Sequence, residues 1–191
     1  MTQVFGNFVE MEEFKQEYLV IGFSPTSIPL QQRWRNNGLS ADFLADYLST
    51  FFPGEDAESL EQQTEVKDAV SYIANELLEN AMKFNHLPSQ YSVSITMQLD
   101  QDNLRFYVTN SLDPASLPAF QRFIQTLLQE DTSELYAKKL MQNFADEPTS
   151  VSGLGFLTMI NNYGAELAWK FGSPPAYPNV NIVTTMVRLP L

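Results

Sequence analysis

Three polar side chains of different chemistry recur at helical spacing between Glu76 and Lys83. Glu76, Asn80 and Lys83 follow one another at intervals of four and three residues, so at about 100° per residue they lie along one edge of a helix. Glu79 points away from that edge. A carboxylate can accept a proton, and an amide oxygen one turn away can bind a divalent cation. The trio could therefore combine a general base with a metal ligand, although an ordinary amphipathic helix with polar flanks shows the same pattern.

The second pattern that could do chemistry is a pair of glycines, Gly153 and Gly155, directly before the apolar segment FLTMINNY. Glycine lets backbone N–H groups approach a bound anion closely, and the N-terminus of a helix carries a partial positive charge. Phosphate groups suit such a place. The same glycines could instead serve only to form a tight loop.

Composition narrows the chemistry further. The chain has 191 residues and a formal net charge of −12, which repels phosphate backbones and anionic lipid surfaces, so no nucleic acid is expected as a partner. It contains no cysteine and a single histidine, His86, which excludes thiolate and multi-histidine metal sites. The local basic cluster at residues 33–35, RWR, fits a solvated loop.

The sequence indicates a cytoplasmic protein without membrane attachment. No segment approaches the roughly 20 apolar residues that span a bilayer, and the N-terminal segment MTQVFGNFVEMEEFK lacks the features of a signal peptide. With 44% hydrophobic residues, the chain is expected to form a single domain over residues 1–191.

The helices that must position these residues follow from periodic apolar residues. The longest is predicted over 64–86, and capping signals at Asp56 and Ser59 favour an earlier start. Ser40 offers an N-cap for a helix over 41–52. Further helices are predicted over 117–128, 133–144 and 156–163, the last ending at Gly164.

Alternating apolar and polar residues predict the strands. A hairpin is expected from 91–99 and 104–108, with further strands at 4–9, 18–23, 165–171 and 180–189. This order predicts an α+β fold, in which a mixed β-sheet is covered by helices on one face. Residues 111–152 separate the hairpin from the glycine pair and form an insertion of the size of a lid.

Both patterns resemble motifs of one family. The segment ELLENAMK at residues 76–83 resembles the N-box, E-x-x-x-N-A-x-K, of the ATP-binding domain shared by gyrase, heat-shock chaperones, histidine kinases and mismatch-repair proteins, the GHKL superfamily. GLGFL at residues 153–157 resembles the G-L-G-L core of its second glycine box. The resemblance extends from roughly residue 40 to the C-terminus in the order of elements.

What the resemblance implies is a two-layer Bergerat-type ATP-binding fold that binds ATP and Mg²⁺. It implies that Asn80 binds the magnesium ion and that Glu76 is the general base. Lys83 would offset phosphate charge, and the loop of Gly153 and Gly155 would contact the phosphates.

One motif departs from the family pattern. GHKL proteins usually carry D-x-G-x-G at the end of the strand before the lid, where the Asp accepts the adenine amino group. The matching segment, VTNSLDP at residues 108–114, has no glycine. Asn110 stands in the place of the Asp, and its neutral amide oxygen could accept the same bond more weakly. Asp113 is the other candidate, so affinity and selectivity for adenine stay open.

A short GHKL domain of this kind is similar to SiaB-like small protein kinases and, in role, to the anti-sigma-factor serine kinases of partner-switching pathways. The resemblance implies an ATP-dependent serine/threonine kinase acting on a small STAS-like or SiaC-like partner protein. A degenerate GHKL-fold binding module without catalysis, which contacts its partner through the lid or residues 33–35, is the alternative. The sequence does not separate a kinase from an ATPase, and it leaves a homodimer open.

Overall fold

The computed structural model describes residues 2–11, 17–24, 34–52, 56–100, 103–144 and 153–191, and of residues 34, 57 and 142–144 it describes the backbone alone. This part of the chain forms the following elements: β1 (Gln3–Phe5), β2 (Glu17–Phe23), α1 (Trp34–Ser49), α2 (Ala57–Phe84), the 3-10 turn η2 (Leu87–Ser89), β3 (Val93–Leu99), β4 (Asn103–Ser111), α3 (Leu117–Gln129), α4 (Thr132–Phe144), α5 (Leu154–Tyr163), β5 (Glu166–Gly172) and β6 (Ile182–Pro190).

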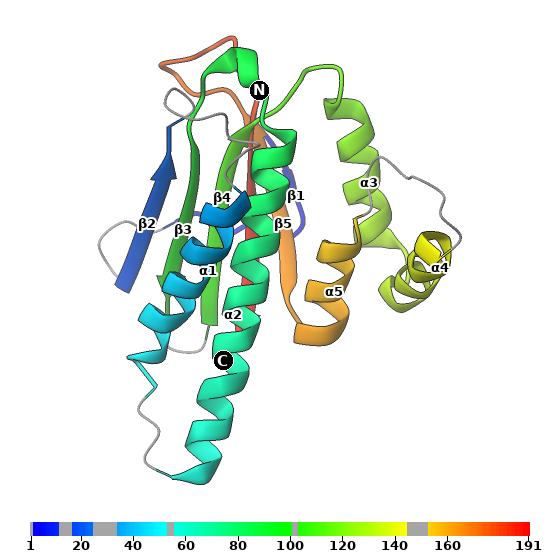
Figure 1. Cartoon of the computed structure of the whole chain (residues 1–191). Helices are drawn as coiled ribbons and strands as arrows, with labels where there is room; N and C mark the ends of the chain where they lie inside the picture. The colour runs from blue at the N-terminus through cyan, green and yellow to red at the C-terminus, as the bar shows by residue number, and fades with distance from the viewer. Residues whose placement is uncertain (1, 12–16, 25–33, 53–55, 101–102, 145–152) are drawn as a thin grey trace.

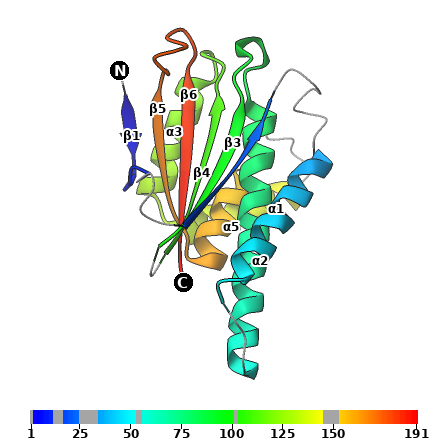
Figure 2. The ribbon, with the colours of Figure 1, turned by 90° about the vertical axis from the view of Figure 1, so that its left-hand side faces the viewer.

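The strands form one six-stranded sheet in the order β1-β5-β6-β4-β3-β2, so the first two strands of the chain lie at opposite edges (Figure 2). The helices cover one face of it (Figure 1). The two-layer α+β sandwich expected from the sequence is therefore confirmed. Every pairing between the described strands is antiparallel, so the sheet is antiparallel rather than mixed.

The long helix α2 starts where its capping signals place it. The Asp56 carboxylate accepts a hydrogen bond from the backbone N–H of Ser59 at 2.8 Å, and the Ser59 hydroxyl accepts one from the N–H of Asp56 at 3.1 Å. This reciprocal capping box satisfies two N–H groups that have no partner within the helix. The helix therefore begins before residue 64, and its first turns extend beyond the sheet (Figure 1).

The start of α1 differs from the sequence prediction. The helix begins at Trp34, so Ser40 lies inside it and is not its N-cap. Asn37 is 3% exposed and Ala41 is fully buried. Of the described side chains in the added turn, only Asn37 is buried, so the earlier start is not signalled by apolar periodicity.

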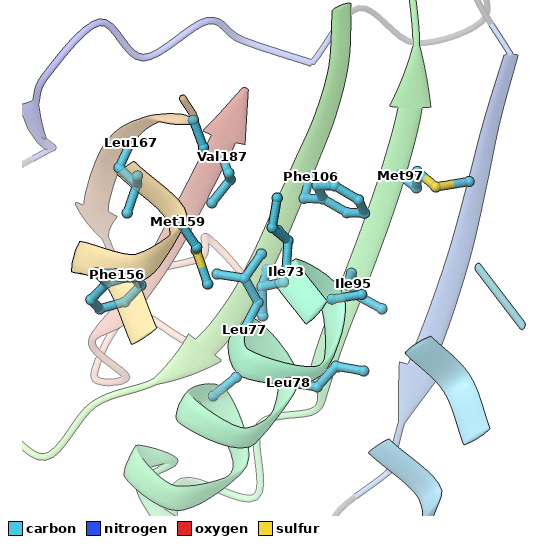
Figure 3. Packing of buried hydrophobic residues seen from close by; sticks show 14 of the residues in the cluster. Ile73, Leu77, Leu78, Ile95, Met97, Phe106, Phe156, Met159, Leu167 and Val187 are labelled. Carbon is cyan, nitrogen blue, oxygen red and sulfur yellow. The ribbon is translucent and has the colours of Figure 1, made fainter. Parts of the chain in front are cut away.

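A continuous apolar core joins the two layers (Figure 3). Ile73 and Leu77 of α2 face Ile95 and Phe106 of the sheet, and Met159 of α5 lies beside them. Within the described residues, no helix combines the length and hydrophobicity that a membrane span requires.

The second face of the sheet is crossed by the chain after β1. We name Gly6–Met11 the N-terminal strap. Gly6 has φ 74°, and a Cβ there would lie 2.8 Å from the carbonyl oxygen of Leu167, so glycine permits this close approach. Phe8 packs against Tyr107, Ala168 and Met186 on the helix-free face.

Candidate functional site

The two motifs meet where Glu76 of α2 lies against Gly155 of α5. A Cβ on residue 155 would overlap the Oε2 atom of Glu76, so a glycine is required there for the close approach of the carboxylate. Gly155 is the second residue of α5, where backbone N–H groups have no partner inside the helix. The carboxylate thus lies beside the first turn of α5, where an anion approaching the helix N-terminus would compete with it for space.

Gly153 is required for a different reason. It is the N-cap of α5 with φ 58°, in the left-handed region that favours glycine. A Cβ there would also overlap the ring of Phe123 on α3. The first helix of the predicted lid therefore packs on the glycine turn. Residues 145–152, the end of that predicted lid, lie outside the described residues.

Asn80 and Lys83 continue the edge of α2 that begins at Glu76. Asn80 is partly exposed and Lys83 is exposed, with the Lys83 ammonium 5.3 Å from the centroid of the Phe84 ring. The amide of Asn80 and the cation of Lys83 therefore follow Glu76 at one- and two-turn spacing along α2. Among the described residues, no group of three or more Asp, Glu, His or Cys could hold a metal ion. A cation at Asn80 would take its other ligands from water and bound phosphate oxygens.

The protonation of Glu76 is shifted by its surroundings. Partial burial raises the pKa of its carboxyl group above the ordinary value, the charge of Glu79 adds to this, and Lys83 acts in the opposite direction. A raised pKa makes a carboxylate a better proton acceptor at neutral pH. This environment fits a general base.

The end of β4 is hydrogen bonded to the residues that follow α2. Ser111 donates from its backbone N–H and its hydroxyl to the Oδ1 atom of Asn85, at 3.0 and 2.8 Å. The N–H of His86 donates to the carbonyl oxygen of Ser111 at 3.2 Å. These bonds bring the segment with the altered glycine box next to the end of the helix that carries Lys83.

Asn110, the residue before Ser111, is 5% exposed. Its Nδ2 atom donates to the carbonyl oxygen of Ser111 at 2.8 Å, which identifies the Oδ1 atom as the one that could accept a bond from a ligand. In the two-residue period of β4, Asn110 shares the helix side of the sheet with Phe106. It therefore faces the layer that holds Asn80.

Asp113 lies away from this arrangement. Its side chain is exposed, and its Oδ1 atom accepts a hydrogen bond from the backbone N–H of Ala115 at 2.9 Å. This is the local bond of a turn that starts at an aspartate. Of the two candidates for contact with a base, the geometry favours Asn110.

Sequence reasoning missed three residues of this region. Besides Phe123, Tyr72 lies one turn before Glu76 on α2 and stacks on Tyr163 with ring centroids 5.2 Å apart. Asn85 is buried, and its Nδ2 atom has no partner in the part of the chain that the structure describes. A buried amide donor of this kind is usually satisfied by water or by a bound molecule. Its place two residues after Lys83 was the only signal in the sequence.

Comparisons with known proteins identify a shared fold through solved structures, and no match to a protein family. No protein-family model matches the chain, and no curated protein matches it. Among solved structures, a chain in the crystal structure of the SiaB–SiaC complex from Pseudomonas aeruginosa matches with a TM-score of 0.55 and 15% identity, over 91% of this chain and 89% of that chain. The mycobacterial sensor histidine kinase MprB matches with a TM-score of 0.33 and 18% identity, over 65% of this chain and 73% of that chain. This chain therefore shares the fold of a chain of the SiaB–SiaC complex over nearly its whole length.

Proposed function

We propose that this chain is an ATP- and Mg²⁺-dependent serine/threonine kinase that phosphorylates a small partner protein in a partner-switching pathway. The observation that carries the proposal is the contact between Glu76 and Gly155, which brings a carboxylate of raised pKa beside the first turn of α5, where phosphate groups would bind. The shared fold with a chain of the SiaB–SiaC complex supports it.

The residues present fit a magnesium nucleotide. Asn80 would bind the cation through its amide oxygen, and the N–H groups after Gly153 would bind phosphate oxygens, with Lys83 offsetting their charge. Asn110 would accept from the base, and the buried Nδ2 atom of Asn85, which has no partner among the described residues, would offer a donor. Bound ATP would supply the phosphoryl group to be transferred.

In the transfer step, Glu76 takes the proton of the partner's hydroxyl group. That oxygen forms a bond to the γ-phosphorus as the bond from phosphorus to ADP breaks. The Glu76 carboxylate would first move off Gly155, because it lies against the first turn of α5 where the phosphates would bind. Nucleotide binding and release of the base are thus one rearrangement.

A SiaC-like protein is the proposed partner, because the structural neighbour comes from a complex of SiaB with SiaC. A STAS-like protein would offer the same kind of acceptor hydroxyl. The net charge of −12 favours a partner with a basic contact face.

The experiment that tests this function is a pull-down of the partner followed by transfer of labelled phosphate from ATP. Glu76→Gln is expected to abolish the transfer while keeping nucleotide binding, because glutamine has similar size and cannot take the proton. Glu65→Gln, at an exposed position of the same helix, is the matched control and should transfer normally. Normal transfer by Glu76→Gln would show that the role of this residue is wrong.

A second candidate function is a binding module without catalysis. The absence of glycines from residues 108–114 and the carboxylate placed on Gly155 favour it. Calorimetry with ATP and Mg²⁺ separates the two functions. No heat of binding at millimolar nucleotide would contradict the kinase and favour the binding module. Of the basic segment named for such binding, Arg33 lies outside the described residues and Arg35 is exposed.

A further inference from the structure

The helix-free face of the sheet carries an ordered row of polar side chains. Four residues are successive cross-strand partners on neighbouring strands: Lys170 of β5, Thr184 of β6, Thr109 of β4 and Ser94 of β3. Directly paired residues of this kind lie side by side on one face. The hydroxyl oxygens of Thr109 and Thr184 are 2.9 Å apart and hydrogen bonded.

A second row lies next to the first. Thr96 of β3 is paired with Tyr107 of β4, which adds two more hydroxyl groups. Both residues are buried, at 6% and 5% exposure. Six polar side chains therefore gather on a face that has no helix over it (Figure 2).

The N-terminal strap turns this face into a pocket. Phe8, Glu10 and Met11 of the strap, together with the loop after β5, border a half-open cavity of about 340 Å³ over the two rows. The volume lies at the lower end of the range of about 300–1,000 Å³ for small-molecule sites. Phe8 meets the Tyr107 ring edge-on, with centroids 6.1 Å apart.

The hydroxyl group of Tyr107 has no hydrogen-bond partner among the described residues. Its oxygen is buried, and no atom of the described residues accepts from it or donates to it. Burial raises the pKa of this phenol, so it stays protonated and can donate. A buried hydroxyl without a partner is costly. The oxygen has almost no accessible surface, so a molecule in the adjoining pocket accepts from it only after a neighbouring side chain shifts.

The pocket as a whole is neutral. Lys170 and Glu10 are the charged residues of its lining, and the ammonium lies 2.6 and 2.8 Å from the two carboxylate oxygens. The other polar groups are mainly hydroxyls, which both donate and accept. Such a lining matches an uncharged ligand rich in hydroxyl groups better than an anion or a cation, and the Phe8 ring offers an apolar wall for its C–H groups.

We propose that this pocket binds an uncharged polyhydroxylated molecule of monosaccharide size, with the Tyr107 hydroxyl as a donor to it. The site lies on the face of the sheet opposite the helices, so it is distinct from the proposed kinase site and does not depend on it.

Binding of D-glucose and of myo-inositol to the whole chain, followed by NMR, tests the proposal. Glucose 6-phosphate and glucosamine serve as the anionic and cationic arms. At least one uncharged probe should bind with a dissociation constant of about 1 mM or below, shift the resonances of Thr96, Thr109 and Thr184, and bind more tightly than both charged arms.

Tyr107→Phe distinguishes a ligand contact from a structural role. It should weaken binding by about two- to tenfold, the effect of one lost hydrogen bond, without lowering the melting temperature. Tyr177→Phe, at an exposed tyrosine outside the lining, is the matched control and should bind normally. Binding of neither uncharged probe, tighter binding of a charged arm, or unchanged binding by Tyr107→Phe would overturn the proposal and leave a pocket filled by water.

Discussion

The two faces of the sheet are built from the same strands and carry different chemistry. On β4, Phe106 and Val108 point to the helices and are buried among apolar side chains, whereas Tyr107 and Thr109 point to the other face and bring hydroxyls to a pocket. A period of two residues is enough to produce this contrast. The helix face supplies most of the cohesion of the fold, and the groups proposed for catalysis lie at its rim.

This division has a consequence for the two proposed sites. The contact between Glu76 and Gly155 is made by α2 and α5, whereas the pocket is made by strands and the N-terminal strap. Changes that are well separated and share no partners usually have additive effects. Each site should therefore be removable without loss of the other.

The largest effect is expected for phosphate transfer in Glu76→Gln. Loss of a general base usually lowers the rate by about 10²–10⁴-fold. Labelled ATP and the captured partner measure this rate. The same variant should still bind uncharged sugar in the pocket on the other face, and a parallel loss of both activities would contradict the separation of the two faces.

Stability should differ strongly between the faces. Phe106→Ala removes a fully buried ring from the core on the helix side and is expected to lower the free energy of unfolding by about 3–5 kcal/mol. Thr96→Val on the opposite side removes a hydroxyl with little change in shape and should cost less than about 1 kcal/mol. Urea denaturation measures the free energy of unfolding of both variants. Equal losses in the two variants would contradict the expected difference between the faces.

A pair of matched glycine substitutions examines the rim of the helix face. Gly155→Ala places a Cβ on the Glu76 carboxylate, which lies at the end of a flexible side chain and must turn away. This cost offsets the gain of about 0.5–1 kcal/mol that alanine gives within a helix, so the free energy of unfolding should change little. Gly38→Ala, in helix α1 with no atom within 4 Å of the added carbon, should instead stabilise the chain by about 0.5–1 kcal/mol. Urea denaturation gives both values. A gain in Gly155→Ala as large as that in Gly38→Ala would show that displacing the carboxylate has no cost.

The smallest effect is a dependence of stability on pH. The pKa of Glu76 is raised, chiefly by burial, so the folded chain binds this proton more tightly than the unfolded chain does. The resulting stabilisation is present below the unfolded pKa of about 4.3 and is lost as pH rises through the folded pKa. Glu76→Gln, which cannot ionise, should therefore gain in melting temperature relative to wild type between about pH 4 and neutral pH.

The control for the pH series is Glu65→Gln on the exposed side of the same helix. Its difference from wild type should change less over the same range. If the difference between Glu76→Gln and wild type stays constant with pH, the burial of this carboxyl group has no effect on its protonation.

Periodic patterns made most of the fold readable from the sequence. The hairpin, the two helices at 117–128 and 133–144, and the glycine cap at Gly164 all occur within a few residues of their predicted positions. These features depend on neighbouring residues. The start of α1 was missed because the added residues 35–39 are mostly exposed and carry no apolar periodicity, whereas Ser40 offers a local capping signal.

The candidate site was readable only in part. Glu76 and Gly155 carry recognisable patterns, but the carboxylate resting on the glycine is a contact between distant segments that neither pattern contains. Asn85 and Phe123 lie outside any motif, and their positions follow from how β4 and α3 pack. The pocket depends on strand register and on the path of the strap across the sheet. The alternation of apolar and polar residues predicted which side chains share a face of each strand, but not which residues of neighbouring strands lie side by side.

The measurement that tests the central claim most directly is a calorimetric titration of the chain with ATP in the presence and absence of Mg²⁺, repeated on Asn80→Ala. The account expects saturable heat that depends on Mg²⁺ in the wild type, and its loss in Asn80→Ala with the melting temperature of the free chain little changed. No heat in the wild type at millimolar nucleotide, or the same magnesium-dependent binding in both chains, would contradict a nucleotide site formed by α2 and the glycine turn.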